Sequence, residues 1–288
     1  MVANFSVVQT ISDVRSHVHS AQKQGKSVGV VPTMGALHAG HISLLQEARK
    51  QSDFVIATIF VNPTQFAPHE DLEKYPRPQE ADLQICRDEK VDLVFMPPPA
   101  EMYPEGFSSL VDVGGISSLL EGEHRPNHFR GVTTVVLKLF HITSPDAAFF
   151  GQKDYQQQLL IKKMCKDLNL STKIITCPTL RAPDGLALSS RNQYLSKTER
   201  QEALSLFQTL QFACTTLQNG ETNISKVIDA MKSKLALTPN ISIDYVTIRH
   251  PETLAELQKT IPQMVALVAA TVGKTRLIDN IIISVTIQ

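Results

Sequence analysis

The sequence lacks paired cysteines. Its four cysteines, at positions 86, 165, 177 and 214, are scattered, and none lies in a C-x-x-C pair. The chain therefore carries neither a cysteine zinc motif nor a dithiol redox motif. Isolated cysteines in a chain of 288 residues are typical of buried free thiols in a reducing compartment. We expect free thiols and no metal held by protein ligands.

The sequence also lacks an excess of charge and a long hydrophobic run. Its 28 Lys and Arg residues equal its 28 Asp and Glu residues, which argues against binding to nucleic acid or to an anionic membrane. The apolar runs 54–61 and 264–272 are too short to cross a bilayer. Residues 1–5 lack a basic region before an apolar run, so no signal peptide is expected. These absences predict a cytoplasmic protein.

No internal repeat or low-complexity tract is visible, and the composition is that of an ordinary globular protein with one large or two ordinary domains. Up to about residue 182, helical and strand patterns alternate. A first helix is expected over 11–24, capped by Ser12 or Asp13. Strands are expected at 28–31, 54–61, 91–96, 147–150 and 172–177, and the intervening helices at 42–50, 80–89, 132–140 and 155–168. This alternation predicts an α/β domain, residues 1–182, with a parallel sheet.

The order of predicted helices and strands changes after Leu195. Two amphipathic helices are expected over 197–219 and 223–237, followed by strands at 241–248, 264–270 and 276–285. Grouped helices followed by grouped strands predict a smaller α+β domain, residues 183–288.

The segment 28–41, V-G-V-V-P-T-M-G-A-L-H-A-G-H, predicts a buried strand, a turn and the start of a helix. His38 and His41 then lie at a helix N-terminus, where unpaired N–H groups and the helix dipole favour anions. Gly35 and Gly40 allow a nucleotide to approach the backbone. Two imidazoles can donate to phosphate oxygens. The segment therefore favours a nucleotide phosphate site.

Three other interpretations of H-x-G-H are a metal-site fragment, a helix cap, and chance. The zinc-protease motif H-E-x-x-H requires histidines four apart with a glutamate between them, whereas His38 and His41 are three apart with no glutamate. Metal binding is therefore disfavoured.

Other polar segments follow predicted strands. Asn62 and Gln65 follow the strand 54–61, at the edge of an α/β sheet where ligands bind, although ordinary turn chemistry is an alternative. The segment 151–154, G-Q-K-D, repeats the strand-to-helix corner and adds a lysine for phosphate. The segment 181–192 can wrap a triphosphate or serve as a linker. The long irregular segment 101–130 includes Arg125 and His128, whose roles the spacing leaves open.

Five motifs occur in one order: P-T-M-G-A-L-H-A-G-H, F-V-N-P-T-Q-F, G-Q-K-D-Y-Q-Q, D-G-L-A-L-S-S-R-N and R-L-I-D-N. Together they closely resemble the pantothenate synthetase (pantoate–β-alanine ligase) family over nearly the whole chain. The resemblance implies a Rossmann-like domain, a smaller C-terminal lid domain and a homodimer. It also implies ATP-dependent condensation of (R)-pantoate with β-alanine through a pantoyl adenylate, with Mg²⁺ accompanying ATP.

The resemblance also implies residue roles. His41 matches a general acid, and His38 joins it at the phosphates. Gln65 and Gln157 match the glutamines that hold pantoate, with Asn62 a weaker candidate. The ATP-binding positions are Met34, Gly35, Ala36, Leu37, His38, Ala39, Gly40, His41, Gly151, Gln152, Lys153, Asp154, Leu180, Leu188, Ser189, Ser190 and Arg191.

Two rival functions remain. One is another H-x-G-H enzyme that adenylylates a phosphate-bearing substrate and releases no AMP. The other is a synthetase-like module that binds RNA without catalysis, against which the zero net charge weighs.

Overall fold

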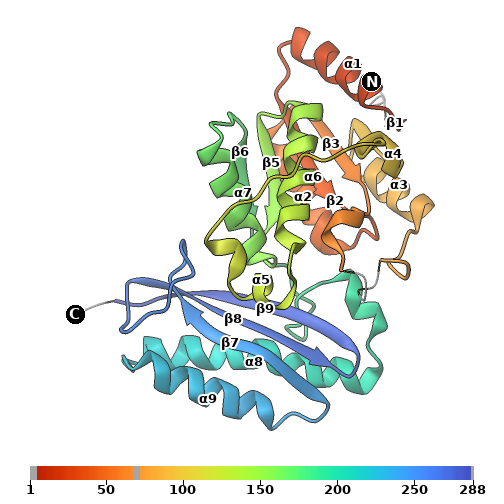
Figure 1. The fold of residues 1–288 in the computed structure, drawn as a ribbon. Coiled ribbons are helices and arrows are strands. Elements are labelled where there is room, and N and C mark those ends of the chain that lie inside the picture. The colour runs from red at the N-terminus through yellow and green to blue at the C-terminus, as the bar shows by residue number, and fades with distance from the viewer. Residues whose placement is uncertain (1–4, 68–69, 71, 287–288) are drawn as a thin grey trace. The chain divides into compact units, whose positions relative to one another are not determined.

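The computed structural model describes residues 5–67, 70 and 72–286 (Figure 1). Residues 1–4, on which part of the signal-peptide expectation rests, lie outside them. The chain divides into two compact units. The first unit runs to Gln152 and resumes with Gln156–Pro178, and the second comprises Lys153–Tyr155 and the chain from Thr179 onward. The predicted domain limit after residue 182 stays a prediction.

The first unit is built on a parallel sheet of six strands in the order β1-β4-β3-β2-β5-β6. The predicted α/β class is therefore confirmed. Strand β1 was not predicted, because three residues are too few to show a period. The strands are β1 (Ser6–Val8), β2 (Val28–Thr33), β3 (Phe54–Ile59), β4 (Leu93–Phe95), β5 (Ala147–Gly151) and β6 (Lys173–Cys177).

Helices pack on both faces of this sheet. Val28 and Val30 of β2 face a core that includes α1, α6 and α7, whereas Val31 faces a second core with α2 and α3. Two buried faces explain why β2 and β3 are continuous apolar runs. The helices are α1 (Ile11–Lys23), α2 (Ala39–Gln51), α3 (Gln79–Asp88), α4 (Pro99–Met102), α5 (Glu121–His124), α6 (His128–Thr143) and α7 (Tyr155–Asp167), with short 3₁₀ turns η1 (Pro63–Gln65) and η2 (Ile116–Ser118).

One local prediction was wrong and another held only in part. Helix α1 is capped by Thr10, whose side chain accepts from the Asp13 N–H, and not by Ser12 or Asp13. The segment 101–130, expected to be irregular, is irregular over 103–115 but also contains the end of α4, the turn η2, helix α5 and the first turn of α6. Helices of one turn have no apolar stripe, so periodicity could not find them.

The strand order changes direction between β2 and β5. From β2 the chain proceeds through β3 to β4, then crosses to β5 and β6 on the other side of β2. Ligands of open α/β sheets bind at the carboxyl ends of the strands that flank such a reversal. The chain leaves β2 into the H-x-G-H segment, and β5 ends at Gly151, directly before Gln152. The topology thus brings these two corners to one edge of the sheet.

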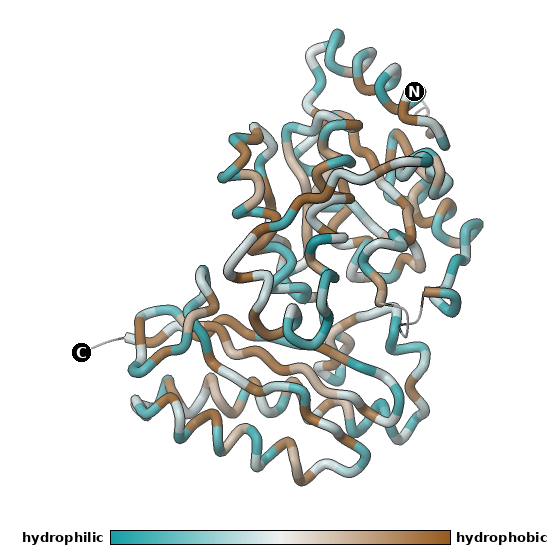
Figure 2. The backbone as a smooth tube through the Cα atoms, in the orientation of Figure 1, coloured by the Kyte–Doolittle hydropathy of each residue, from teal (hydrophilic) through white to brown (hydrophobic). Residues whose placement is uncertain are grey.

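The second unit is an antiparallel sheet, β7-β8-β9, packed against two helices, as the predicted α+β domain requires. Hydrophobic residues, brown in Figure 2, recur along both helices between hydrophilic ones. The elements are η3 (Ser190–Tyr194), α8 (Lys197–Gln218), α9 (Ile224–Ala236), β7 (Ile241–Arg249), β8 (Gln263–Val272) and β9 (Thr275–Ser284).

The four cysteines are free, as predicted, and three of them are fully buried. Burial raises the pKa of Cys86 to about 12 and those of Cys165 and Cys177 to about 11, so these thiols stay protonated at neutral pH. No helix in the described part of the chain is long and apolar enough to cross a membrane.

Candidate active site

His38 and His41 cap helix α2. The Nδ1 atom of His38 accepts a hydrogen bond from the Gly40 N–H (3.1 Å), and the Nδ1 atom of His41 accepts from the His38 N–H (3.3 Å). The ring centroids are 4.2 Å apart. The cap that was an alternative to ligand binding is therefore present, and it holds the two imidazoles side by side at a helix N-terminus.

The cap also determines which ring nitrogen carries the proton. An Nδ1 atom that accepts from a backbone N–H has no proton of its own, so the proton of each neutral ring lies on Nε2. Both rings then carry an Nε2–H group next to the positive end of the α2 dipole. This arrangement suits phosphate oxygens and the charge that develops on them.

A buried carboxylate holds the loop before His38. Asp82 of α3 accepts hydrogen bonds from the N–H groups of Ala36 (2.9 Å) and Leu37 (2.7 Å). Its side chain is 2% exposed, and burial raises its pKa against the effect of these two bonds. Ala36 has φ +51° and Gly35 has φ +86°, and a Cβ on Gly35 would lie 2.9 Å from the Asp82 carboxylate. Asp82 therefore fixes a left-handed loop that only a glycine at position 35 fits.

Gln65 is the last residue of η1, and Asn62 is the residue that caps the start of this turn, shortly after β3. The Asn62 side chain is 1% exposed, and its amide donates to the Gln65 Oε1 and to the Gly131 carbonyl, each at 3.1 Å. Its Oδ1 accepts from the Tyr103 hydroxyl at 2.7 Å. With its polar atoms engaged by protein, Asn62 is suited to supporting Gln65 more than to binding a ligand directly.

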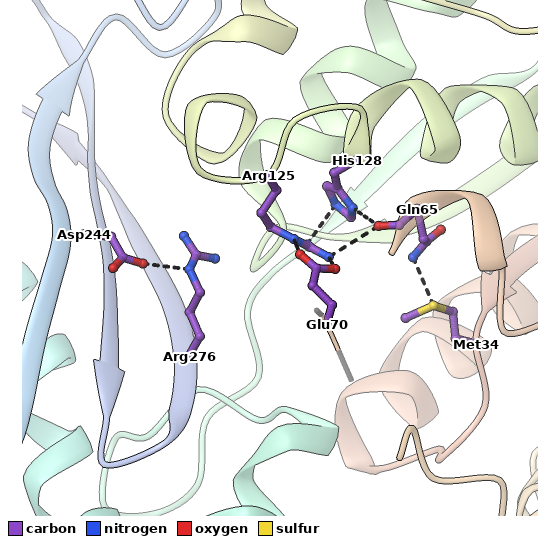
Figure 3. A network of polar contacts seen from close by, with 7 residues as sticks. All are labelled: Met34, Gln65, Glu70, Arg125, His128, Asp244 and Arg276. Atoms are coloured by element: carbon purple, nitrogen blue, oxygen red, sulfur yellow. Dashed lines mark hydrogen bonds and ion pairs between the residues drawn. The ribbon is translucent and has the colours of Figure 1, made fainter. Parts of the chain in front are cut away.

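The Gln65 side chain is half-buried and donates to the Met34 Sδ at 3.0 Å (Figure 3). Thioether sulfur is a weak acceptor, so a ligand oxygen can displace this bond at little cost. Within the first unit, this hydrogen bond links Gln65 to Met34 in the loop after β2.

A polar network holds the backbone of Gln65. The His128 Nδ1 lies 2.8 Å from the Gln65 carbonyl, and its Nε2 lies 3.1 Å from the Arg125 Nη1 (Figure 3). Arg125 in turn makes two bonds of 2.7 Å to the Glu70 carboxylate. Because a guanidinium has only donors, the His128 Nε2 is the acceptor and its Nδ1–H donates to Gln65. The network therefore needs a neutral His128.

Three consecutive glutamines begin helix α7, and the structure separates them. Gln156 accepts from the Glu121 N–H and donates to two carbonyls, and Gln158 accepts from the Thr176 hydroxyl. Both are 3% exposed. Gln157 is half-buried, and its side chain has no recorded hydrogen bond within the described residues. Of the three, Gln157 is the side chain available for a substrate.

The remaining predicted ATP residues lie in the second unit, except Gly151 and Gln152, which belong to the first. Lys153 is half-buried, with its Nζ 3.7 Å from the Asp154 carboxylate. Leu180 and Leu188 are joined by a backbone bond at the base of a hairpin. Ser189 caps η3 by accepting from the Arg191 N–H at 3.2 Å, which places Ser190 and Arg191 in the first turn.

The profile of the pantoate-beta-alanine ligase family matches residues 6–282. The pantothenate synthetase of Moorella thermoacetica is 50% identical over 279 residues, which span 97% of this chain and 99% of that protein. The pantothenate synthetase structure from Thermus thermophilus has a TM-score of 0.91 and 42% identity over 96% of this chain and 98% of that one.

The chain belongs to the pantoate–β-alanine ligase family. A Francisella tularensis pantoate-beta-alanine ligase, solved in complex with beta-gamma ATP and beta-alanine, has a TM-score of 0.79 and 38% identity over 96% of this chain and 97% of that chain. The predicted family, fold class and ligase activity are confirmed.

Sequence reasoning missed some residues that contact the predicted site residues or their neighbours in the structure. Asp82 could have been noticed as a carboxylate four residues before Cys86, on the buried face of α3. Tyr103 and Glu70 gave no local signal, because each acts through a contact distant in sequence: 41 residues separate Tyr103 from Asn62, and 55 separate Glu70 from Arg125.

Substitution of Asp82 tests the loop. We expect Asp82→Asn to lower stability by about 1–3 kcal/mol. The asparagine oxygen can accept from only one of the two backbone N–H groups, and its NH₂ group then faces the other N–H group, which has lost its acceptor. Affinity for ATP is expected to fall as the loop before His38 relaxes. Calorimetric binding of a non-hydrolysable ATP analogue and thermal unfolding measure the two effects. Asp88→Asn, on the exposed side of the same helix, is the control and should change neither.

The lowered pKa of His128 predicts that the fold is less stable in acid. Burial, and then the positive charge of Arg125, lower the pKa of His128 to about 4. The unfolded chain binds this proton near pH 6.5 but the folded chain only near pH 4, so stability falls as pH drops through this window, by about 3 kcal/mol. Urea unfolding at pH 7 and at pH 4.5 measures the loss. His128→Asn keeps a donor for the Gln65 carbonyl but does not titrate, so an equal acid loss in this variant would contradict the assignment.

Proposed function

We propose that this ligase joins (R)-pantoate to β-alanine and converts ATP to AMP and pyrophosphate. The observation that carries the proposal is the pair His38 and His41, whose rings lie 4.2 Å apart at the N-terminus of α2, directly after β2 and beside its neighbour β5 in the sheet. A carboxylate is a poor acylating group, and adenylation supplies AMP as a leaving group. No protein nucleophile is needed, so catalysis rests on positioning and on donors around the phosphates.

The reaction has two steps. A pantoate carboxylate oxygen attacks the α-phosphorus, and the bond to the β-phosphate oxygen breaks to release pyrophosphate. The β-alanine amine then attacks the acyl carbon of pantoyl adenylate, AMP leaves with the bonding electrons, and the nitrogen loses a proton. In the first step His38 and His41 stabilise the growing phosphate charge, and His41 acts as general acid.

The other residues bind and orient. Gln65 and Gln157 hold pantoate, since among the described residues the Gln65 Nε2 donates to the weak acceptor Met34 Sδ and the Gln157 side chain makes no hydrogen bond. Asn62 acts through Gln65. The nucleotide is held by the segment Met34–His41, by Gly151, Gln152, Lys153 and Asp154, by the Leu180 backbone, and by Leu188, Ser189, Ser190 and Arg191.

Magnesium enters as part of the substrate MgATP. Mg²⁺ keeps several waters and binds through phosphate oxygens with one or two carboxylates. No cluster of three metal-ligating side chains exists among the described residues.

The proposal extends to a cytoplasmic homodimer. Free, buried thiols fit a reducing compartment. The homodimer is proposed because the family resemblance implies it. Analytical ultracentrifugation at micromolar concentration tests it: a single species of the monomer mass of 31.8 kDa would contradict it.

Pyrophosphate release tests the reaction. With ATP and pantoate alone, we expect a burst of about one pyrophosphate per active site, because pantoyl adenylate stays bound. Sustained release of AMP is expected only when β-alanine is added. An enzyme that adenylylates a phosphate-bearing acceptor would release pyrophosphate with that acceptor and no AMP. Absence of pyrophosphate in all mixtures would contradict the proposal.

A further inference from the structure

Two adjacent residues of β9, Asp279 and Asn280, are buried in the second unit although both are polar. Their exposed fractions are 4% and 2%. Buried polar side chains need hydrogen-bond partners within the protein. The partners found here belong to two segments that the proposed function assigns to the nucleotide.

The first segment is the one that contains Lys153. The Asn280 Nδ2 donates to the Lys153 carbonyl at 2.9 Å, across 127 residues of sequence. Two residues further on, the Tyr155 hydroxyl donates to the Pro251 carbonyl at 2.9 Å. These bonds explain why Lys153–Tyr155 cluster with the second unit, whereas the preceding residue, Gln152, donates its N–H to Cys177 of the first unit.

The second segment is the hairpin that leads to Ser189 and Arg191. The Arg181 guanidinium binds the Asp279 carboxylate with two bonds of 2.6 and 2.8 Å and lies 3.7 Å from the Phe207 ring. It also reaches the Gly185 carbonyl at 3.2 Å within the hairpin and the Asn280 carbonyl at 3.3 Å. Asn280 is therefore bonded to both segments, through its side chain to Lys153 and through its backbone to Arg181.

We infer that Asn280 is a positioning residue for Lys153, and that β9 holds Lys153 and the 181–191 segment as one body. The partly buried hydrogen bond to the Lys153 carbonyl restrains the backbone from which the ammonium group extends. Asp279 restrains the hairpin in the same way through Arg181. The cations for the nucleotide phosphates are thus fixed relative to each other by two neighbouring residues of one strand.

This inference rests on the proposed role of Lys153 in binding ATP. If Asn280 acts only through Lys153, its loss matters only while the lysine side chain is present. A double-mutant cycle separates this from a general loss of structure, which would act in either background.

The experiment uses the full-length chain and four proteins: wild type, Asn280→Ala, Lys153→Ala and the double variant. The readouts are Kd for a non-hydrolysable ATP analogue, and KM and kcat for ATP and for pantoate. We expect Asn280→Ala to weaken ATP binding about tenfold, because the Lys153 carbonyl loses the donor that restrains its backbone, with the KM for pantoate unchanged. In the Lys153→Ala background we expect no further loss. Asn280→Asp, of equal size but without the donor, should behave as Asn280→Ala.

Ile283→Ala is the control for stability. Ile283 lies on the same strand with no exposed surface, so its truncation lowers Tm and should leave the Kd for ATP unchanged. Equal losses from Asn280→Ala in both backgrounds, or no loss in wild type, would overturn the inference. Unchanged ATP binding in Lys153→Ala would overturn both this inference and the proposed role of Lys153. The proposed reaction would still stand if the wild type forms pantothenate.

Discussion

Replacement of His41 by asparagine is expected to slow pantoyl-adenylate formation by about 10²–10³-fold while the fold is retained. Asparagine can offer its Oδ1 where the imidazole has Nδ1, so the acceptor for the His38 N–H is kept. It has no group at the position of Nε2, so the donor to the phosphates is lost. Quench-flow measurement of pyrophosphate release in the first turnover gives the rate of this step.

His41→Gln provides the converse variant. The glutamine amide reaches the position of Nε2 and can donate there, but no acceptor remains at Nδ1, so the cap at α2 is lost. We expect a loss of stability of about 1 kcal/mol with a smaller loss of rate than in His41→Asn. Turnover close to wild type in His41→Asn would contradict the proposed role of the Nε2–H group.

Replacement of Gly131 by alanine is expected to lower kcat/KM for pantoate by about 10²-fold, the scale of a displacement of about 1 Å at a reacting group. Gly131 lies in the first turn of α6 against η1. A Cβ there would lie 2.7 Å from the Gln65 backbone nitrogen and closer still to the Thr64 carbonyl. Backbone atoms cannot move aside by a side-chain rotation, so α6 and η1 must move apart to make room for the Cβ.

This displacement moves the supports of Gln65 as well. The Gly131 carbonyl accepts from the Asn62 amide, and the same amide donates to the Gln65 side chain. We therefore expect the KM for pantoate to rise more than the KM for ATP, together with a loss of stability of about 1–3 kcal/mol. Steady-state kinetics and thermal unfolding measure both effects.

Gly114→Ala is the matched control. A Cβ at Gly114 would meet nothing within 4 Å, so neither kinetics nor stability should change. Equal KM values for pantoate in the Gly131 variant and in the wild type would show that Gln65 does not hold this substrate, or that the contact relaxes elsewhere. The pantoate KM of Gln65→Ala separates these two, since only the second predicts a large increase.

Most of the fold could be predicted because its elements carry their own signals. Strands β2 and β3 are continuous apolar runs, which burial on both faces requires. The alternation of strand and helix allows few topologies other than a parallel sheet. Short elements such as β1 and α5 were missed because three or four residues contain no complete period.

The site could be predicted only in part. His38 and His41 stand in a local motif, so their place at a helix N-terminus follows from the residues around them. The fact that their Nδ1 atoms are used in the cap, which leaves the protons on Nε2, depends on the angles at which the loop enters α2. Those angles are held by Asp82, which is 46 residues from Ala36.

The sequence by itself determined the fold class, the family and the set of side chains available for phosphate and pantoate, because periodicity and motif order are properties of neighbouring residues. The tertiary structure alone decided which of those side chains remain available. It turned Gln156 and Gln158 inward and left Gln157 without a recorded bond within the described residues. It also tied Lys153 to Asn280. Such contacts join distant parts of the chain, and their hydrogen bonds exist only where the folded path brings donor and acceptor together.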